Sequence, residues 1–96
     1  MTAKEMLKSR REEILRVAAA HGARQVRVFG SVVRGEETVS SDVDFLVRLE
    51  SGRTLLDLVG LKQALEDTLG RKVDVLTEGG ISPHLRDRIL REATPL

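Results

Sequence analysis

The stretch VFGSVVRGEETVSSDVDFLV, from Val28 to Val47, decides the fold because it holds parts of two candidate strands and the connection between them. Polar and apolar residues alternate in QVRVF over residues 25–29, which predicts a strand with one buried face. Residues 30–41 are rich in Gly, Ser, Glu and Thr, a composition typical of a loop or a short helical turn. A second strand is predicted over residues 43–49. Because the connection is short, the two strands are expected to be antiparallel.

The composition is that of an ordinary globular domain. The chain has 96 residues, of which 41% are hydrophobic and 32% charged, and this length predicts one domain over residues 1–96. The formal net charge of +1 and the aromatic content of 2% argue against direct nucleic-acid binding, which usually needs a basic face and stacking side chains. The sequence contains no cysteine and no apolar run of membrane-spanning length. A cytoplasmic protein without disulfides is therefore expected.

Helical patterns flank the predicted strands. Thr2 and Glu5 have the spacing of a capping box, and Thr54 precedes a stripe of leucines at helical spacing. Pro83 directly after Ser82 is typical of the first position of a helix. The chain therefore has the order α-β-loop-β-α-β-α, an α+β fold with a three-stranded mixed sheet. The predicted elements are a helix from Thr2 to about His21, strands over 25–29, 43–49 and 72–76, a helix from Thr54 to Gly70, a loop over 77–81 and a helix from Pro83.

The second strand carries a pair of acids. Because side chains alternate along a strand, Asp42 and Asp44 are expected on one face together with Leu46, and the opposite face is expected to carry Val43, Phe45 and Val47. Residues two apart lie about 6.6 Å apart along a strand, so the two carboxylates can converge on one small group. Simpler interpretations exist for each acid alone. Asp42 can form an Asx turn, and Asp44 can pair with Arg48 or Lys72.

The predicted topology brings a third acid to the same place. A helix joins the second and third strands, and a strand-helix-strand crossover normally makes its strands parallel neighbours. Asp74, in KVDVL, then lies beside Asp42 and Asp44, near the starts of the strands. The antiparallel first strand ends at Gly30 and Ser31, beside the same point. Topology alone therefore predicts that all five residues meet.

This combination predicts a nucleotide site. Three neighbouring carboxylates repel one another and cannot all stay ionised unaided. Mg²⁺ is a hard cation that suits one or two carboxylates together with substrate phosphates. Gly30 lets the backbone approach a bulky anion, and Ser31 adds a hydroxyl and an N–H donor. With two metal ions, one would activate an acceptor oxygen and the other would stabilise a leaving pyrophosphate.

The same residues carry a resemblance to a known family. The pattern Gly30-Ser31-x-x-Arg34-Gly35, followed by Ser41-Asp42-Val43-Asp44 and by a third Asp in VDV, resembles the polymerase-β-type nucleotidyltransferase superfamily. Nearly the whole chain is similar to its minimal nucleotidyltransferases, the MNT proteins. The stretches RTLLDLVGL, LGRKVDVL and SPHLRDRIL resemble the prokaryotic branch that is paired with HEPN-domain proteins and includes MntA-type antitoxins.

The resemblance implies a structure, a reaction and roles for the residues. It implies a mixed sheet in the order 1-2-3 and transfer of AMP from ATP to a tyrosine hydroxyl of a HEPN ribonuclease toxin, which silences that toxin. Asp74 is implied to help activate the acceptor. The resemblance implies that two Mg²⁺ ions are bound. The implied catalytic and metal-binding residues are Asp42, Asp44 and Asp74, and the implied triphosphate-binding residues are Gly30, Ser31 and Arg34.

Alternatives of other classes stay open. Members of the branch often have Arg directly after Gly-Ser, whereas this chain has Val32. A degenerate nucleotidyltransferase that neutralises its partner by binding alone is therefore the second hypothesis. A third is nucleotide transfer to a small molecule such as an aminoglycoside, although no second domain is predicted to form that pocket. Because the chain resembles only a catalytic core, a partner protein is expected to present the acceptor, in a homo-oligomer or a mixed complex.

Overall fold

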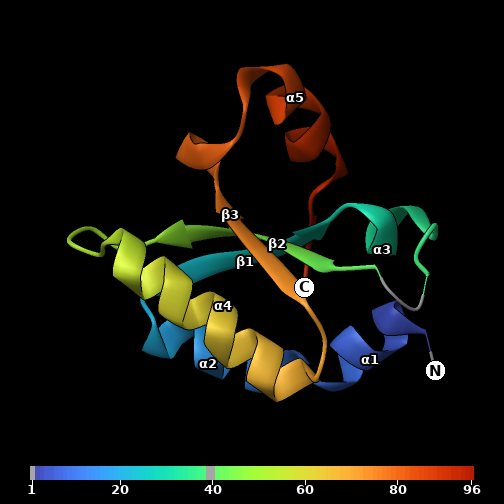
Figure 1. The fold of residues 1–96 in the computed structure, drawn as a ribbon, viewed down its shortest axis with the longest axis horizontal. Helices are drawn as coiled ribbons and strands as arrows, with labels where there is room; N and C mark the ends of the chain where they lie inside the picture. The colour runs from blue at the N-terminus through green and yellow to red at the C-terminus, as the bar shows by residue number, and fades with distance from the viewer. Residues whose placement is uncertain (1, 39–40) are drawn as a thin grey trace.

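The computed structural model describes residues 2–38 and 41–96, which form one twisted sheet with helices on both of its faces (Figure 1). The α+β class predicted from the sequence is confirmed. Within the described residues, no helix is both long enough and apolar enough to cross a membrane. In chain order the elements are α1 (Ala3–Ser9), α2 (Arg11–Ala20), β1 (Ala23–Phe29), α3 (Ser31–Arg34), β2 (Val43–Leu49), α4 (Leu55–Leu69), β3 (Val73–Thr77), a 3₁₀ turn η1 (Glu78–Gly80), α5 (Pro83–Glu92) and β4 (Thr94–Pro95).

The pairing of the first three strands is the predicted one. β1 pairs antiparallel with β2, and β2 pairs parallel with β3 across the helical crossover α4. The register places Phe29 opposite Asp44, and Asp44 opposite Asp74. The end of β1 and the starts of β2 and β3 therefore meet at one end of the sheet.

The prediction of three strands is wrong, because the sheet has four in the order β3-β2-β1-β4. The additional strand β4 pairs antiparallel with β1 on the side away from β2. It is only two residues long and contains Pro95, which is tolerated because proline can occupy an edge strand without a ladder N–H. So short a segment has no alternating pattern that would predict a strand.

Two apolar clusters hold the two faces of the sheet. The larger cluster lies between the sheet and the helices α1, α2 and α4, and it includes the fully buried side chains of Ile14, Phe45 and Leu61. The smaller cluster lies on the face that α5 covers and consists of Phe29, Leu46, Ile81 and Ile89. Alternation along β2 explains the division, because successive residues point to opposite faces.

The helix predicted from Thr2 to about His21 is in fact two helices, divided at Arg10. The Ser9 hydroxyl donates a hydrogen bond to the Met6 carbonyl at 2.8 Å, and the Arg10 N–H donates to the same carbonyl at 3.1 Å. The division lies in the backbone of Arg10, whose φ of −110° and ψ of 17° depart from helical values. The predicted capping box at Thr2 is confirmed, with both of its hydrogen bonds present.

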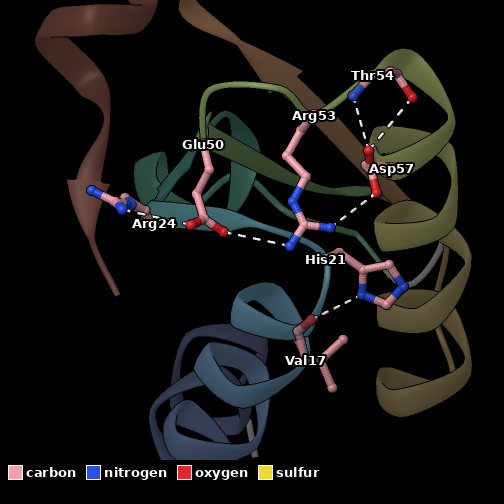
Figure 2. Close-up of polar contacts among 7 residues, drawn as sticks. All are labelled: Val17, His21, Arg24, Glu50, Arg53, Thr54 and Asp57. Carbon is pink, nitrogen blue, oxygen red and sulfur yellow. Dashed lines mark hydrogen bonds and ion pairs between the residues drawn. The ribbon is translucent and has the colours of Figure 1, made fainter.

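A polar network fixes the connection from β2 to α4 (Figure 2). Glu50 pairs with Arg24 at 3.5 Å and with Arg53 at 3.6 Å, and Arg53 also pairs with Asp57 at 3.3 Å. Asp57 accepts the Thr54 N–H at 2.9 Å and completes the capping box that starts α4. Each exposed pair contributes little alone, about 0 to 1 kcal/mol. Together they orient the helix that carries the chain back to β3.

Truncation of the core side of α4 is expected to destabilise the protein strongly. Leu61→Ala removes a fully buried side chain and should lower the free energy of unfolding by about 3 kcal/mol. Leu56→Ala makes the same chemical change on the same helix at an 81% exposed position and should change it by less than about 0.5 kcal/mol. Urea denaturation of both variants measures the difference. Equal losses would show that the larger cluster does not carry the fold.

Candidate active site

The predicted residues meet because of where their strands begin and end. Asp44 and Asp74 are each the second residue of a strand, and they are register partners in the parallel pair β2–β3. Neighbouring strands lie about 4.8 Å apart, so the two carboxylates start from adjacent positions on one face. That face also carries Leu46, which belongs to the cluster under α5. Asp42 directly precedes β2 and is exposed, as is Asp74.

Gly30 is required by the close approach of Asp44. A Cβ atom built on Gly30 would lie 2.2 Å from the Asp44 Oδ2, a distance that real Cβ atoms do not show. The backbone of Gly30 has φ 83° and ψ −155°, a region that is essentially restricted to glycine. Both observations reflect one constraint. The turn after β1 lies directly against the carboxylate of Asp44.

The charge of Arg34 compensates the carboxylate of Asp44 only in part. Burial, together with the neighbouring charges of Asp74 and Asp42, raises the pKa of Asp44 from an ordinary value of 3.8 to about 6. Within the described residues, no ion pair joins Asp44 to Arg48 or to Lys72. The simpler interpretation of Asp44 as half of a salt bridge with either residue is therefore not supported.

The three acids fit a cation that is bound together with a substrate. In the part of the chain that the structure describes, no three His, Cys, Asp or Glu side chains form a preassembled metal site. Mg²⁺ does not need one, because it is commonly bound by one or two carboxylates and completes its shell with waters and phosphate oxygens. Asp44 and Asp74 supply hard oxygen donors, and their mutual repulsion is the kind that a bound cation relieves.

The other side of the site begins with α3. Ser31 is its first residue and is half-buried. Val32, at the position where the resemblance leads one to expect Arg, is 3% exposed and packs in the larger apolar cluster. The side chain at this position therefore fills the core and adds no charge to the acidic face.

Arg34 lies at the site but is already paired. Its Nε donates to Glu36 at 2.9 Å and its Nη1 donates to Glu92 at 2.7 Å. Glu92 also accepts the Gly30 N–H at 2.7 Å, so one carboxylate bridges the turn after β1 and the guanidinium. Burial opposes the ionisation of Glu92, but the hydrogen bonds from Arg34 and Gly30 outweigh it and lower the pKa of Glu92.

Glu92 is the residue at this site that the sequence did not reveal. It lies 62 residues from Gly30 along the chain. In the sequence it is one of several charged residues in the last helix, and no motif distinguishes it from a solvated side chain. Only the path of the chain from α5 into β4, which returns to the edge of β1, brings Glu92 to the site.

Substitution of Gly30 tests the contact with Asp44. Gly30→Ala should lower the free energy of unfolding by at least about 2 kcal/mol, because the new methyl group meets the Asp44 carboxylate in a backbone region reserved for glycine. Gly35→Ala is the matched control, since φ is 73° there and nothing lies within 4 Å of the built Cβ. It should cost only about 1 kcal/mol. Equal losses in urea denaturation would contradict the close approach.

The pKa of Asp44 predicts a dependence of stability on pH. Because its folded pKa is raised, the folded protein binds more protons than the unfolded chain between about pH 4 and 6, so stability falls as pH rises through this window. Asp44→Asn should therefore raise the free energy of unfolding at pH 8, by about 1 kcal/mol after allowance for solvent screening, and leave it unchanged near pH 3.5.

Asp57→Asn is the control for this pH experiment. The backbone hydrogen bond from Thr54 lowers the pKa of Asp57, so its contribution has the opposite sign. The control should destabilise the protein at pH 8 and have a smaller effect as pH falls below 4. Urea denaturation at both pH values measures all three proteins. A destabilising effect of Asp44→Asn at pH 8 would contradict the assignment of Asp44 as an uncompensated charge.

Most of this chain is similar in sequence to known proteins. Residues 7–96 match the family model of the nucleotidyltransferase domain. The candidate protein adenylyltransferase MJ0435 of Methanocaldococcus jannaschii is 47% identical over 83 residues, which cover 86% of this chain and 89% of that protein. The protein adenylyltransferase MntA of Thermococcus cleftensis is 38% identical over 89 residues, which cover 84% of this chain and 90% of that protein.

Solved structures agree with the sequence comparison. A candidate minimal nucleotidyltransferase superimposes with a TM-score of 0.86 and 55% identity, over 100% of this chain and 97% of that chain. A complex of tri-AMPylated Shewanella oneidensis HEPN toxin with MNT antitoxin superimposes with a TM-score of 0.69, over 92% of this chain and 69% of the matched chain. At 17% identity, that second likeness shows the fold alone. The chain therefore belongs to the nucleotidyltransferase domain family, and within it to the minimal, MNT-type enzymes.

Proposed function

We propose that this protein transfers AMP from ATP to a tyrosine hydroxyl of a HEPN-domain partner and thereby acts as the antitoxin of that partner. The observation that carries the proposal is the position of Asp44, which lies beside Asp74 in register and against the turn at Gly30. Two further facts support it. Relatives at 47% and 38% identity are named protein adenylyltransferases, and an MNT antitoxin with this fold occurs in complex with a tri-AMPylated HEPN toxin.

The reaction needs a nucleophile and a leaving group on opposite sides of one phosphorus atom. The acceptor oxygen forms a bond to the α-phosphorus of ATP, and the bond from that phosphorus to the bridging oxygen breaks, which releases pyrophosphate. The hydroxyl proton leaves through Asp74 in this proposal. Asp74 is exposed, so a side chain presented by another protein can approach it.

The acidic residues are proposed to act together with Mg²⁺. Asp42 and Asp44 would hold the metal ions, with Asp74 as the third carboxylate. When bound, Mg²⁺ supplies charge neutralisation for the triphosphate and activation of the acceptor oxygen. The raised pKa of Asp44 supports this assignment, because a carboxylate that is poorly compensated in the free protein is well suited to a cation.

The turn after β1 is proposed to hold the triphosphate. The N–H groups at the start of a helix have no partner within it, and Ser31 adds a hydroxyl to those donors. Gly30 keeps this turn close to Asp44, so phosphate donors and metal ligands lie side by side. Arg34 would supply the positive charge on this side, once its pairs with Glu36 and Glu92 are exchanged.

The ion pairs of Arg34 with Glu36 and Glu92 favour a second candidate function. Because both Glu36 and Glu92 already hold its guanidinium, a protein that binds its partner without using nucleotide would keep this arrangement unchanged. Neutralisation by contact alone is therefore the alternative. It shares the fold and the partner with the first proposal and differs from it in chemistry.

Intact-mass spectrometry of the partner separates the two functions. The full chain is incubated with ATP, Mg²⁺ and the HEPN partner, and the partner should gain one or more AMP units on tyrosine. Asp42→Asn combined with Asp44→Asn should reduce the transfer by about 10²-fold or more, because the metal ligands are removed. The matched control combines Glu12→Gln with Asp67→Asn, two exposed acids on α2 and α4 across the sheet, and should keep full activity.

The outcome for the toxin completes this test. If the double Asp variant still neutralises the toxin while the mass of the partner stays unchanged, binding alone accounts for the function. AMP on a residue other than tyrosine, located by peptide mapping, would instead correct the acceptor.

A further inference from the structure

Glu92 accepts hydrogen bonds from two of the donors that are proposed to bind the nucleotide phosphates. Its Oε2 accepts the Gly30 N–H at 2.7 Å, and its Oε1 accepts the Arg34 Nη1–H at 2.7 Å. A carboxylate and a phosphate present the same kind of anionic acceptor to backbone N–H and guanidinium donors. The side chain of Glu92 is only 14% exposed, so it is settled at this position and is not a surface group that happens to lie near.

Charge decides whether Glu92 helps or opposes a nucleotide. Glu92 is held as an anion, because hydrogen bonds from Arg34 and Gly30 stabilise its ionised form against burial. A triphosphate is also an anion, so the two cannot share the same donors without strong repulsion. If Glu92 only positioned Arg34 for catalysis, it would place a negative charge at the point where phosphate must bind. Competition with phosphate is the interpretation that agrees with the charges.

Comparison with Glu36 shows why competition with phosphate is assigned to Glu92. It also pairs with Arg34, at 2.9 Å from Nε, but its side chain is 65% exposed. Of the two carboxylates, only Glu92 contacts Gly30 as well. Solvent can therefore screen Glu36, whereas Glu92 holds both donors in a more buried place.

The helix that carries Glu92 is lightly anchored. Of the ten residues of α5, only Ile89 is buried, and residues 82–88 are exposed. Arg86 adds one hydrogen bond to the Glu78 carbonyl at 2.7 Å. The helix lies on the sheet face opposite α2 and α4, so it can shift while the larger cluster stays packed (Figure 1). Segments with few buried apolar contacts are the ones that open locally at low cost.

We propose that Glu92 is an autoinhibitory carboxylate, which holds the phosphate donors Gly30 and Arg34 in the nucleotide-free protein and is displaced when ATP binds. This inference rests on the proposed function, since it assumes that the same donors bind the triphosphate. Its consequence is that α5 must loosen from the turn after β1 before the site is competent. The apparent affinity for ATP is then reduced by the fraction of molecules in which Glu92 remains in place.

Nucleotide binding by charge-neutral variants tests the competition. Glu92→Gln keeps the size of the side chain and removes its charge, so calorimetric titration with ATP and Mg²⁺ should show a dissociation constant about three- to tenfold lower than that of the unmodified protein. Glu36→Gln, the matched control on the other side of Arg34, should change it by less than about twofold because Glu36 is screened by solvent. Unchanged or weaker binding by Glu92→Gln would overturn the proposal and leave Glu92 as a structural residue.

Hydrogen exchange on the unmodified chain provides a test that needs no variant. Addition of ATP and Mg²⁺ should speed exchange of the amides in residues 83–92, while those of α4 stay as they were. Slower exchange in residues 83–92 would overturn the proposal, because it would mean that nucleotide binding tightens α5. If neither the unmodified protein nor Glu92→Gln binds ATP in the titration, the proposed nucleotide site itself is wrong, and the inference falls with it.

Discussion

The approach of the Asp44 carboxylate to Gly30 is the constraint on which the site depends. It requires β1 to end at this turn, and it requires the register that pairs Phe29 with Asp44. That register is set by burial, because Val43 and Phe45 flank Asp44 in the strand and are fully buried in the larger cluster. A slip by one residue would turn Asp44 into the core and its apolar neighbours to the surface. The core and the site are thus two consequences of one alternation.

The same arrangement makes the free protein less stable than its packing would allow. A carboxylate whose pKa is raised by burial and by Asp74 and Asp42 weakens the fold at neutral pH. Functional sites commonly store unfavourable electrostatics of this kind. A cation or ligand that relieves the repulsion binds the folded chain in preference to the unfolded one, so ligand binding and stability are linked through Asp44.

Periodicity predicted those parts of the molecule whose signal is local. Alternation in the strands, the stripe on α4 and the crossover rule were sufficient to place Asp44, Asp74 and Gly30 at one end of the sheet. The break at Arg10 was missed because it lies in the backbone of a single residue, within a sequence pattern that remains helical overall. The strand β4 was missed because two residues carry no period. Glu92 was missed because the path of the chain into β4 brings it to the site, and β4 was not predicted.

The two faces of the sheet are packed to different degrees, and this difference bears on function. One face carries three helices and most of the buried side chains, including that of Val32 in the turn after β1. The other carries the acids and is covered by α5, which is attached through the buried Ile89, the partly buried Leu90 and a few polar contacts. Glu92 ends α5 and also holds Gly30 and Arg34, so in the proposed mechanism a triphosphate that displaces Glu92 from these donors would act directly on that helix. A partner that contacts α5 would act on the same donors in return, since coupling between two binding events is reciprocal.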